Sequence, residues 1–258
     1  MNPMQELLQA VADVARRAGD VAQSYFGTGV AVEWKDDGSP VTVADRTAEE
    51  AARAWIQERF PNDAVLGEEF GLSGSASGRR WILDPIDGTK SFVAGVPLWG
   101  TLVAVVEGEE VLAGAINCAA AGELVAAARG EGAWLNGSRC QVSDRAVLDQ
   151  AVVLTTDERY PDSERRRTAW QGLAAQARVV RTWGDCFGYL LVASGRADVM
   201  ADDKMNAWDS ACLLPIIEEA GGVLTDWRGR RTGFGGDSIA TNAALDHAVR
   251  SILCEGER

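Results

Sequence analysis

Two carboxylates three positions apart follow a short apolar run in the segment Trp81–Ser91. The run predicts a buried strand that ends at Asp84, and Pro85 favours a turn because it fixes φ and lacks an N–H. Asp87 can therefore point back toward Asp84. Two hard oxygen ligands on one rigid turn suit Mg²⁺, which keeps several coordination positions for water or a substrate phosphate.

A Gly-Thr pair follows these carboxylates and predicts the start of a short helix. The free N–H groups of Gly88, Thr89 and Lys90 would face the same place, and a helix N-terminus binds anions. Metal and phosphate would therefore meet on one turn. Asp-Pro and Asp-Gly are also frequent turn dipeptides, so this segment alone leaves a purely structural role open.

A second acidic pair could join the same cluster. The apolar stretch Ala64–Gly67 predicts a short strand that delivers Glu68 and Glu69. Adjacent glutamates are usually only solvated charge. Their position at the end of a strand, like that of Asp84, makes one of them a candidate metal ligand.

Two more carboxylates are expected in the first turns of helices. Asp45 follows the predicted start of a helix at Thr42 that runs to about Phe60, and Asp209 lies near the start of a helix predicted over 206–220. An acidic side chain in a first turn commonly interacts with the helix N-terminus. Asp209 would nevertheless complete an oxygen-rich cluster with Glu68, Asp84 and Asp87.

Composition limits the classes of partner. The 258-residue chain is 47% hydrophobic and has a formal net charge of −13, which disfavours binding to nucleic acids or anionic membranes. A small phosphorylated substrate remains compatible if metal ions reverse the local field. The five cysteines show no close pairing, which fits a reducing cytoplasm, and the single histidine, His247, argues against zinc and is expected on a surface helix.

The elements that must position these residues alternate between strands and helices, which indicates α/β architecture. The pattern changes near residue 149, and we expect one domain with an N-terminal α+β lobe (about 1–149) and a C-terminal α/β lobe (about 150–258). The expected helices are 4–26, 42–60, 162–176, 186–195 and 206–220. The expected strands are 64–67, 81–83, 99–107, 111–119, 123–129, 132–135, 152–155, 179–182 and 197–201. The remaining expected features are a loop or hairpin at 30–43, an exposed mobile loop at 71–80 and a hairpin turn at Asn136-Gly137.

Three ordered motifs carry a family resemblance. Gly67-Glu68-Glu69, the segment Trp81–Thr89 and Trp208-Asp209-Ser210-Ala211 resemble the three signatures of the inositol monophosphatase family. The similarity runs from the first predicted helix to the last. Within the family the chain is most similar to the histidinol-phosphate phosphatases, on the stretches 183–189, 191–195 and 205–209. The resemblance implies a layered α-β-α-β-α sandwich, shared with fructose-1,6-bisphosphatase, and a homodimer.

The same resemblance implies how metal would be held. Glu68, Asp84 and the backbone carbonyl of Ile86 would hold one Mg²⁺, and Asp84, Asp87 and Asp209 would hold a second. Glu68 would also help to hold a weaker third ion. Two metal ions can clamp an in-line displacement at phosphorus, and such a reaction needs mostly positioning and charge neutralisation.

The resemblance also implies catalytic and substrate-binding residues. Asp45 and Thr89 would orient and deprotonate the attacking water, and Glu68 would be catalytic through its metal. Substrate contacts are implied for Ile86, Asp87, Gly88, Thr89, Asp185, Asp202 and Asp209. The expected reaction is hydrolysis of histidinol phosphate to histidinol and phosphate, a step of histidine biosynthesis.

Specificity is expected to depend on Asp185 and Asp202, whose family counterparts lie beside the organic part of the substrate. Histidinol phosphate carries an ammonium and an imidazole, whereas inositol offers only hydroxyls. Two carboxylates would favour the cation and disfavour a neutral polyol. The alternative is that Asp185 caps the helix that begins near Cys186. Lys35, in the polar stretch before Val43, could meet phosphate or metal-bound water as this segment closes over the site.

Other phosphatase classes fit less well. A haloacid-dehalogenase phosphatase needs two aspartates two positions apart, and a cysteine phosphatase needs five residues between its cysteine and arginine. Cys140 and Arg145 have four between them. A broad-specificity inositol or sugar phosphatase remains an alternative, as does a catalytically silent metal- or phosphate-binding regulator. The presence of every metal ligand that the resemblance implies, together with the pair Asp45 and Thr89, speaks against the regulator.

Overall fold

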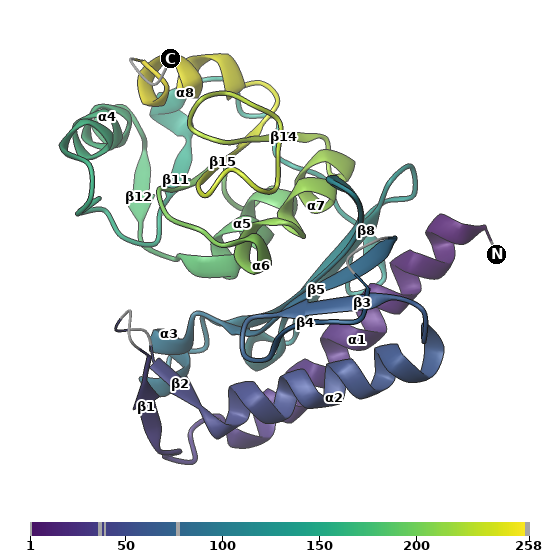
Figure 1. Ribbon diagram of the computed structural model, residues 1–258. Coiled ribbons are helices and arrows are strands. Elements are labelled where there is room, and N and C mark those ends of the chain that lie inside the picture. Colours follow the sequence, from purple (N-terminus) through teal and green to yellow (C-terminus); the bar gives the residue numbers. More distant parts are fainter. Residues whose placement is uncertain (1, 36–37, 39, 76–77, 256–258) are drawn as a thin grey trace.

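Helices and sheets alternate in five layers in the computed structural model, which describes residues 2–35, 38, 40–75 and 78–255 (Figure 1). Helices α1 (Pro3–Tyr25) and α2 (Val43–Arg59) cover one face of an eight-stranded sheet. Helices α5 (Asp185–Ala193), α6 (Ala207–Ser210) and α7 (Leu213–Glu219) lie between this sheet and a five-stranded sheet. Helices α4 (Glu164–Ala174) and α8 (Asp246–Leu253) form the outer layer. The predicted α-β-α-β-α sandwich is confirmed.

The eight-stranded sheet is mostly an antiparallel meander, in which only β3 and β5 pair in parallel. Its order is β10-β9-β8-β7-β6-β5-β3-β4. The strands are β3 (Ala64–Gly67), β4 (Gly71–Ser73), β5 (Arg79–Asp87), β6 (Gly100–Glu107), β7 (Glu110–Cys118), β8 (Glu123–Ala128), β9 (Gly132–Leu135) and β10 (Ser138–Arg139). The prediction of a loop over 71–80 was wrong at both ends, because β4 occupies 71–73 and β5 begins at residue 79. Residues 76 and 77 fall outside the described residues.

Two turns of this lobe agree with the sequence prediction. Asn136 and Gly137 both have positive φ and join β9 to β10 as a tight hairpin. Strands β1 (Val32–Trp34) and β2 (Pro40–Thr42) pair antiparallel, which is the hairpin expected within 30–43. Residues 36, 37 and 39 of the polar stretch fall outside the described residues, so its expected closure over the site stays a prediction.

The five-stranded sheet has the order β12-β11-β13-β15-β14. Strands β11 (Val152–Leu154), β12 (Val179–Arg181) and β13 (Val199–Asp202) are parallel and were expected. Strands β14 (Gly222–Thr225) and β15 (Ser238–Asn242) were missed. Every residue of β15 is buried, including Ser238, Thr241 and Asn242, so it lacks the alternation that marks a half-exposed strand.

The helix expected over 206–220 is two helices. Pro215 lies in the first turn of α7, after the break at Ala211 and Cys212. Proline cannot donate an N–H to the carbonyl four residues earlier, and its ring clashes with that carbonyl, so one continuous helix is disfavoured. The other described helical segments are α3 (Thr89–Val93), η1 (Ala119–Ala121) and η2 (Leu148–Gln150).

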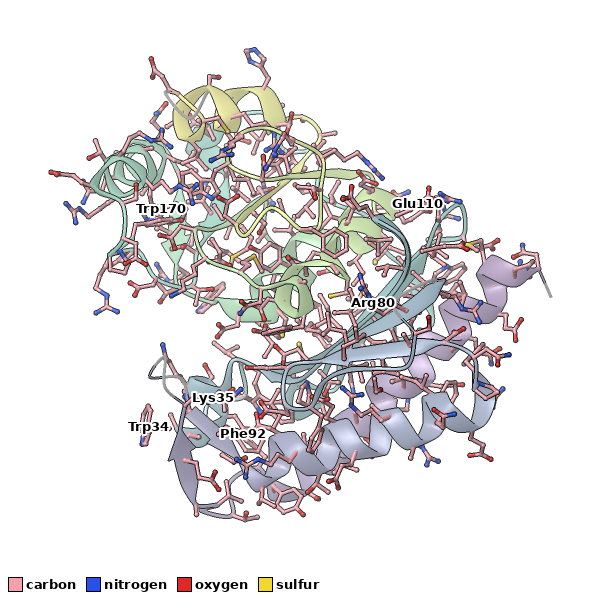
Figure 2. The ribbon with its side chains drawn as sticks, viewed as in Figure 1. Trp34, Lys35, Arg80, Phe92, Glu110 and Trp170 are labelled. Atoms are coloured by element: carbon pink, nitrogen blue, oxygen red, sulfur yellow. The ribbon has the colours of Figure 1, made fainter. Side chains whose placement is uncertain are left out.

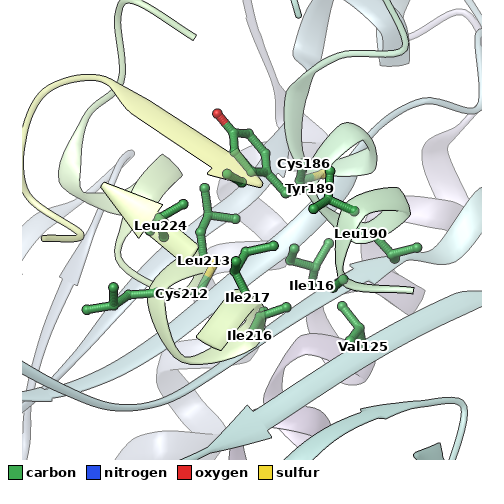
Figure 3. Packing of buried hydrophobic residues seen from close by; sticks show 14 of the residues in the cluster. Ile116, Val125, Cys186, Tyr189, Leu190, Cys212, Leu213, Ile216, Ile217 and Leu224 are labelled. Carbon is green, nitrogen blue, oxygen red and sulfur yellow. The ribbon is translucent and has the colours of Figure 1, made fainter. Parts of the chain in front are cut away.

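The middle helical layer joins both sheets in one hydrophobic core. Side chains from the large sheet, such as Ile116, meet Leu190 and Ile216 from α5 and α7, and Leu224 from the small sheet lies on the other side (Figure 3). The predicted division into lobes near residue 149 stays a prediction. No helix among the described residues has the length and apolar character needed to cross a membrane.

Candidate active site

A β-bulge aims the two carboxylates of the central turn. The pairing of β5 with β6 shifts register between Asp84 and Asp87, and β5 continues through Asp87 rather than ending at Asp84 as expected. The buried Asp84 accepts a hydrogen bond from the N–H of Ile86 at 3.0 Å. The carbonyl of Pro85 accepts one from Thr101 Oγ1 at 2.8 Å. Because bulges redirect side chains next to functional sites, this turn can present both carboxylates to one cleft.

Gly88 makes the start of α3 possible. It has φ of +82°, and a Cβ there would lie 2.9 Å from the carbonyl oxygen of Leu98 and 3.0 Å from Asp185 Oδ2. Thr89 donates from Oγ1 to the carbonyl of Ile86 at 3.0 Å. Gly88, Thr89 and Lys90 all line a cleft of about 500 Å³, and their contact with a phosphate stays a prediction.

Asp209 joins the same cleft from a distant part of the chain. As expected, it lies in a first helical turn, where its Oδ2 accepts from the N–H of Asn206 at 2.6 Å. Asp87 Oδ2 accepts from the N–H of Cys186 at 2.5 Å, which links the central turn to α5. One carboxylate oxygen from each of Asp84, Asp87 and Asp209 lies within 4.8 Å of the others.

These three carboxylates repel one another. Burial raises the pKa of Asp84 well above its usual range, and the negative charges of Glu68, Asp87 and Asp209 add to the shift. Burial also raises the pKa of Asp87, with Asp185 and Asp209 contributing. A divalent cation would relieve this repulsion. An all-oxygen donor set of this charge fits Mg²⁺ better than a soft metal.

Glu68 lines the cleft but lies outside that group of three. Its Oε1 accepts from Lys35 Nζ at 2.8 Å, and Glu69 Oε1 accepts from the same ammonium at 2.7 Å. Lys35 directly follows β1 (Figure 2). Burial lowers the pKa of Lys35, but its bonds to Glu68 and Glu69 outweigh that effect and raise it. Burial also raises the pKa of Glu68, which Lys35 opposes.

Asp45 and Thr89, the expected water-activating pair, have different hydrogen-bond partners. Asp45 is 2% exposed, and its Oδ2 accepts from the N–H and Oγ1 of Thr42 at 2.8 and 2.7 Å. This is the capping box at the start of α2. Burial raises the pKa of Asp45, whereas the bonds from Thr42 act in the opposite direction. The shared role of Asp45 and Thr89 stays a prediction.

Asp185 does not cap α5. The N-cap is Gly184, and Asp185 is the first helical residue with φ of +50°, an uncommon conformation for a residue with a side chain. Its N–H donates to Thr156 Oγ1 at 2.8 Å. Burial raises the pKa of Asp185 to about 7, with Asp202 adding to the shift and Lys90 opposing it.

Asp202 holds Thr156, the residue that accepts the hydrogen bond from Asp185. Its Oδ1 accepts from the N–H of Thr156 at 2.9 Å, and its Oδ2 accepts from the hydroxyl of Tyr189 at 2.9 Å. Both oxygens of Asp202 therefore accept hydrogen bonds from the protein, and its expected contact with substrate stays a prediction. A smaller cavity of about 250 Å³ adjoins the cleft here, with further carboxylates from Asp157 and Asp203 in its wall.

Thr156 was missed by sequence reasoning. It is 29 positions from Asp185 and 46 from Asp202, yet it links the two by hydrogen bonds. Thr156 is the second of two threonines after the short strand β11, and such a pair carries no sequence signal for this role. Lys90 and Lys204 also line the cleft; Lys90 was expected there only through its backbone N–H, and Lys204 was not weighed as a site residue.

The family model described as "Inositol monophosphatase family" matches residues 3–256, and the chain belongs to this family. A relative from Chlorobaculum parvum named histidinol-phosphatase is 45% identical, covering 97% of this chain and 98% of its own. One of the same name from Mycobacterium tuberculosis is 38% identical with the same coverage. The solved structure of extragenic suppressor protein suhB from Bartonella henselae has a TM-score of 0.91 at 28% identity, covering 97% of this chain and 99% of that one. The predicted family is confirmed.

Proposed function

We propose that the protein is a Mg²⁺-dependent phosphomonoesterase that hydrolyses L-histidinol phosphate to histidinol and phosphate, a step of histidine biosynthesis. The observation that carries the proposal is 45% identity, over nearly the whole chain, to a relative named histidinol-phosphatase. The convergence of Asp84, Asp87 and Asp209 in one cleft supports the metal dependence. The prediction made from the three sequence motifs agrees with both observations.

Each site residue then has a distinct task. Glu68, Asp84 and the carbonyl of Ile86 would hold one Mg²⁺, Asp84, Asp87 and Asp209 a second, and Glu68 would contribute to a weaker third. Bound Mg²⁺ lowers the pKa of water and neutralises charge on the phosphoryl oxygens and the leaving alkoxide.

The chain itself supplies positioning. The N–H groups at the start of α3 bind phosphate oxygens, because they lie at a helix N-terminus, where donors point along the helix axis toward the cleft-lining residues. Thr89 and Asp45 orient the attacking water, and Asp45 takes its proton, for which its raised pKa makes it a better base. The water oxygen bonds to phosphorus as the phosphorus–oxygen bond to histidinol breaks. The alkoxide that leaves takes a proton from a second water, and the proton held by Asp45 returns to the hydroxide that this forms.

Asp185 is proposed to recognise the cationic part of the substrate. It is partly exposed at the junction of the cleft and the smaller acidic cavity. Carboxylates outnumber the two ammonium groups of Lys90 and Lys204 there, so an ammonium or imidazolium would offset the excess negative charge and a neutral polyol would not. Asp202 would act mainly by holding Thr156, which in turn holds the backbone of Asp185.

Asp185→Asn is expected to raise KM for histidinol phosphate about tenfold, equivalent to about 1.4 kcal/mol of binding free energy. The expected cause is loss of charge pairing with the substrate cation, so KM for myo-inositol 1-phosphate, which carries no cation, should not rise in parallel. Initial rates with both substrates measure this. Asp149→Asn, at an exposed position outside the cleft, serves as control. An unchanged KM and an unchanged preference between the two substrates would remove the assignment.

The activity itself is tested by phosphate release from L-histidinol phosphate and from myo-inositol 1-phosphate, each with Mg²⁺ and with EDTA. We expect Mg²⁺-dependent turnover with a strong preference for histidinol phosphate. A preference for the inositol ester would keep the metal mechanism and discard the substrate assignment. Turnover in EDTA would refute the metal dependence.

We further propose a cytoplasmic homodimer whose single phosphatase domain has two lobes, 1–149 and 150–258. Five cysteines without a disulfide support a reducing compartment, and the net charge of −13 supports a small-molecule partner rather than nucleic acid or membrane.

Light scattering would measure the mass of the assembly in solution. A mass equal to that of the 27.5 kDa chain would refute the dimer.

A further inference from the structure

Glu49 is a fully buried carboxylate on α2, one helical turn after Asp45. In the sequence, a glutamate four positions before Arg53 resembles an ordinary ion pair on a helix surface. The structure instead buries it at 0% exposure. A buried ionised carboxylate requires hydrogen-bond partners, so the identity of those partners indicates what Glu49 does.

The partners of Glu49 belong to the turn that carries Glu68. Glu49 Oε2 accepts from the N–H of Glu69 at 2.8 Å, and Oε1 accepts from the N–H of Phe70 at 3.3 Å. The N–H of Glu68 donates to the carbonyl of Leu83 at 3.2 Å. Three consecutive backbone N–H groups are therefore held, one by β5 and two by Glu49.

Arg53 fixes Glu49 in turn. Its Nε donates to Glu49 Oε1 at 2.7 Å, and its two terminal nitrogens donate to Ser73 Oγ at 2.7 Å and to the carbonyl of Gly71 at 2.5 Å. The planar guanidinium thus ties the carboxylate to β4, the strand that follows the turn, a geometry that lysine cannot reproduce.

Gly67 shows how closely the carboxylate packs against the end of β3. A Cβ at this position would lie 2.0 Å from Glu49 Oε1 and 2.3 Å from its carboxyl carbon. Any side chain there would displace Glu49. The close approach of α2 to β3 therefore depends on glycine in the residue that precedes Glu68.

We propose that Glu49 is a positioning residue for the metal site. By holding the N–H groups of Glu69 and Phe70, it sets where the Glu68 carboxylate enters the cleft, and so sets the affinity for Mg²⁺. Because Asp45 lies on the same face of α2, one rigid helix positions both the residue assigned to the water and a residue assigned to the metal. This inference rests on the proposed metal-dependent function.

The test is Glu49→Gln, which keeps the size of the side chain but turns one acceptor into a donor. Titration calorimetry of EDTA-treated protein with MgCl₂, without substrate, is expected to show a Kd raised about 10- to 100-fold. KM for histidinol phosphate at saturating Mg²⁺ should be unchanged. In the metal-free protein, hydrogen exchange at the amides of Glu69 and Phe70 should accelerate about tenfold.

Glu50→Gln is the matched control, since Glu50 is the next residue on α2 and is exposed. Arg53→Lys is a second variant, with a smaller loss of Mg²⁺ affinity expected, and it replaces Glu49→Gln if that variant fails to fold. A lower melting temperature with unchanged Mg²⁺ affinity would overturn the proposal. A wild-type chain that binds Mg²⁺ but does not hydrolyse histidinol phosphate overturns only the proposed substrate, and the affinity comparison still decides the role of Glu49.

Discussion

Asp84→Asn is expected to lower kcat by at least about 10²-fold at saturating substrate and ordinary Mg²⁺ concentrations. Loss of a residue that only supports a metal ligand typically costs 10- to 100-fold in activity or affinity, so loss of a ligand assigned to both metal ions should cost more. Asparagine can still accept from the N–H of Ile86, so the turn should keep its shape. Initial-rate assays across a range of Mg²⁺ concentrations measure the effect.

The same variant is expected to be more stable than wild type in EDTA. The raised pKa of Asp84 means that the folded state disfavours its ionised form, so the charge lowers stability at every pH above the usual pKa of aspartate. A neutral amide removes this cost, and each kcal/mol shifts the melting temperature of a domain this size by about 2–4 °C. Added Mg²⁺ should raise the melting temperature of wild type but not of the variant. Equal stabilisation of both by Mg²⁺ would contradict the site assignment.

Asp198→Ala is expected to lower the free energy of unfolding by about 3–5 kcal/mol, the largest stability effect we predict. Asp198 is 0% exposed and accepts from the N–H of Val152 at 2.7 Å and from Arg145 at 3.0 Å. It also accepts from Ser143 and Asn242. Its loss removes the acceptor of the Val152 N–H and of the Ser143 and Arg145 side chains where the segment after β10 meets β11, β13 and β15.

Urea denaturation followed by tryptophan fluorescence measures this loss. Asp198→Asn keeps one acceptor oxygen and is expected to lose less stability than the alanine variant. Asp144→Asn, an exposed aspartate in the same segment, should change the unfolding free energy by less than about 0.5 kcal/mol. A loss as small for Asp198→Ala as for this control would refute the structural role. Residual activity of folded Asp198→Ala should be near wild type, because the residue does not line the cleft.

The sequence by itself determined the local parts of this protein. Thr42 and Asp45 begin α2 as a capping box, and the apolar run before Asp84 forms β5, because caps and buried strands depend on residue types a few positions apart. The order and spacing of the three motifs determined the family. The local sequence pattern was misleading at two places. Pro215 divided a segment whose apolar pattern suggested one continuous helix, and the uniformly buried β15 lacked the alternation that marks a strand.

Only the tertiary structure decided which distant residues meet. Asp209 was already expected to join Asp84 and Asp87. By contrast, no sequence signal indicated that Thr156 links Asp185 to Asp202 or that Glu49 holds the turn that carries Glu68. These contacts join elements that are far apart in sequence, through strand pairing and the packing of helices between two sheets, and residue spacing does not encode them. The sequence of a glutamate four positions before an arginine is the same whether the glutamate side chain faces solvent or the end of a strand. The packing of α2 against β3 made the difference, because burial leaves a charged group only the partners that the fold brings to it.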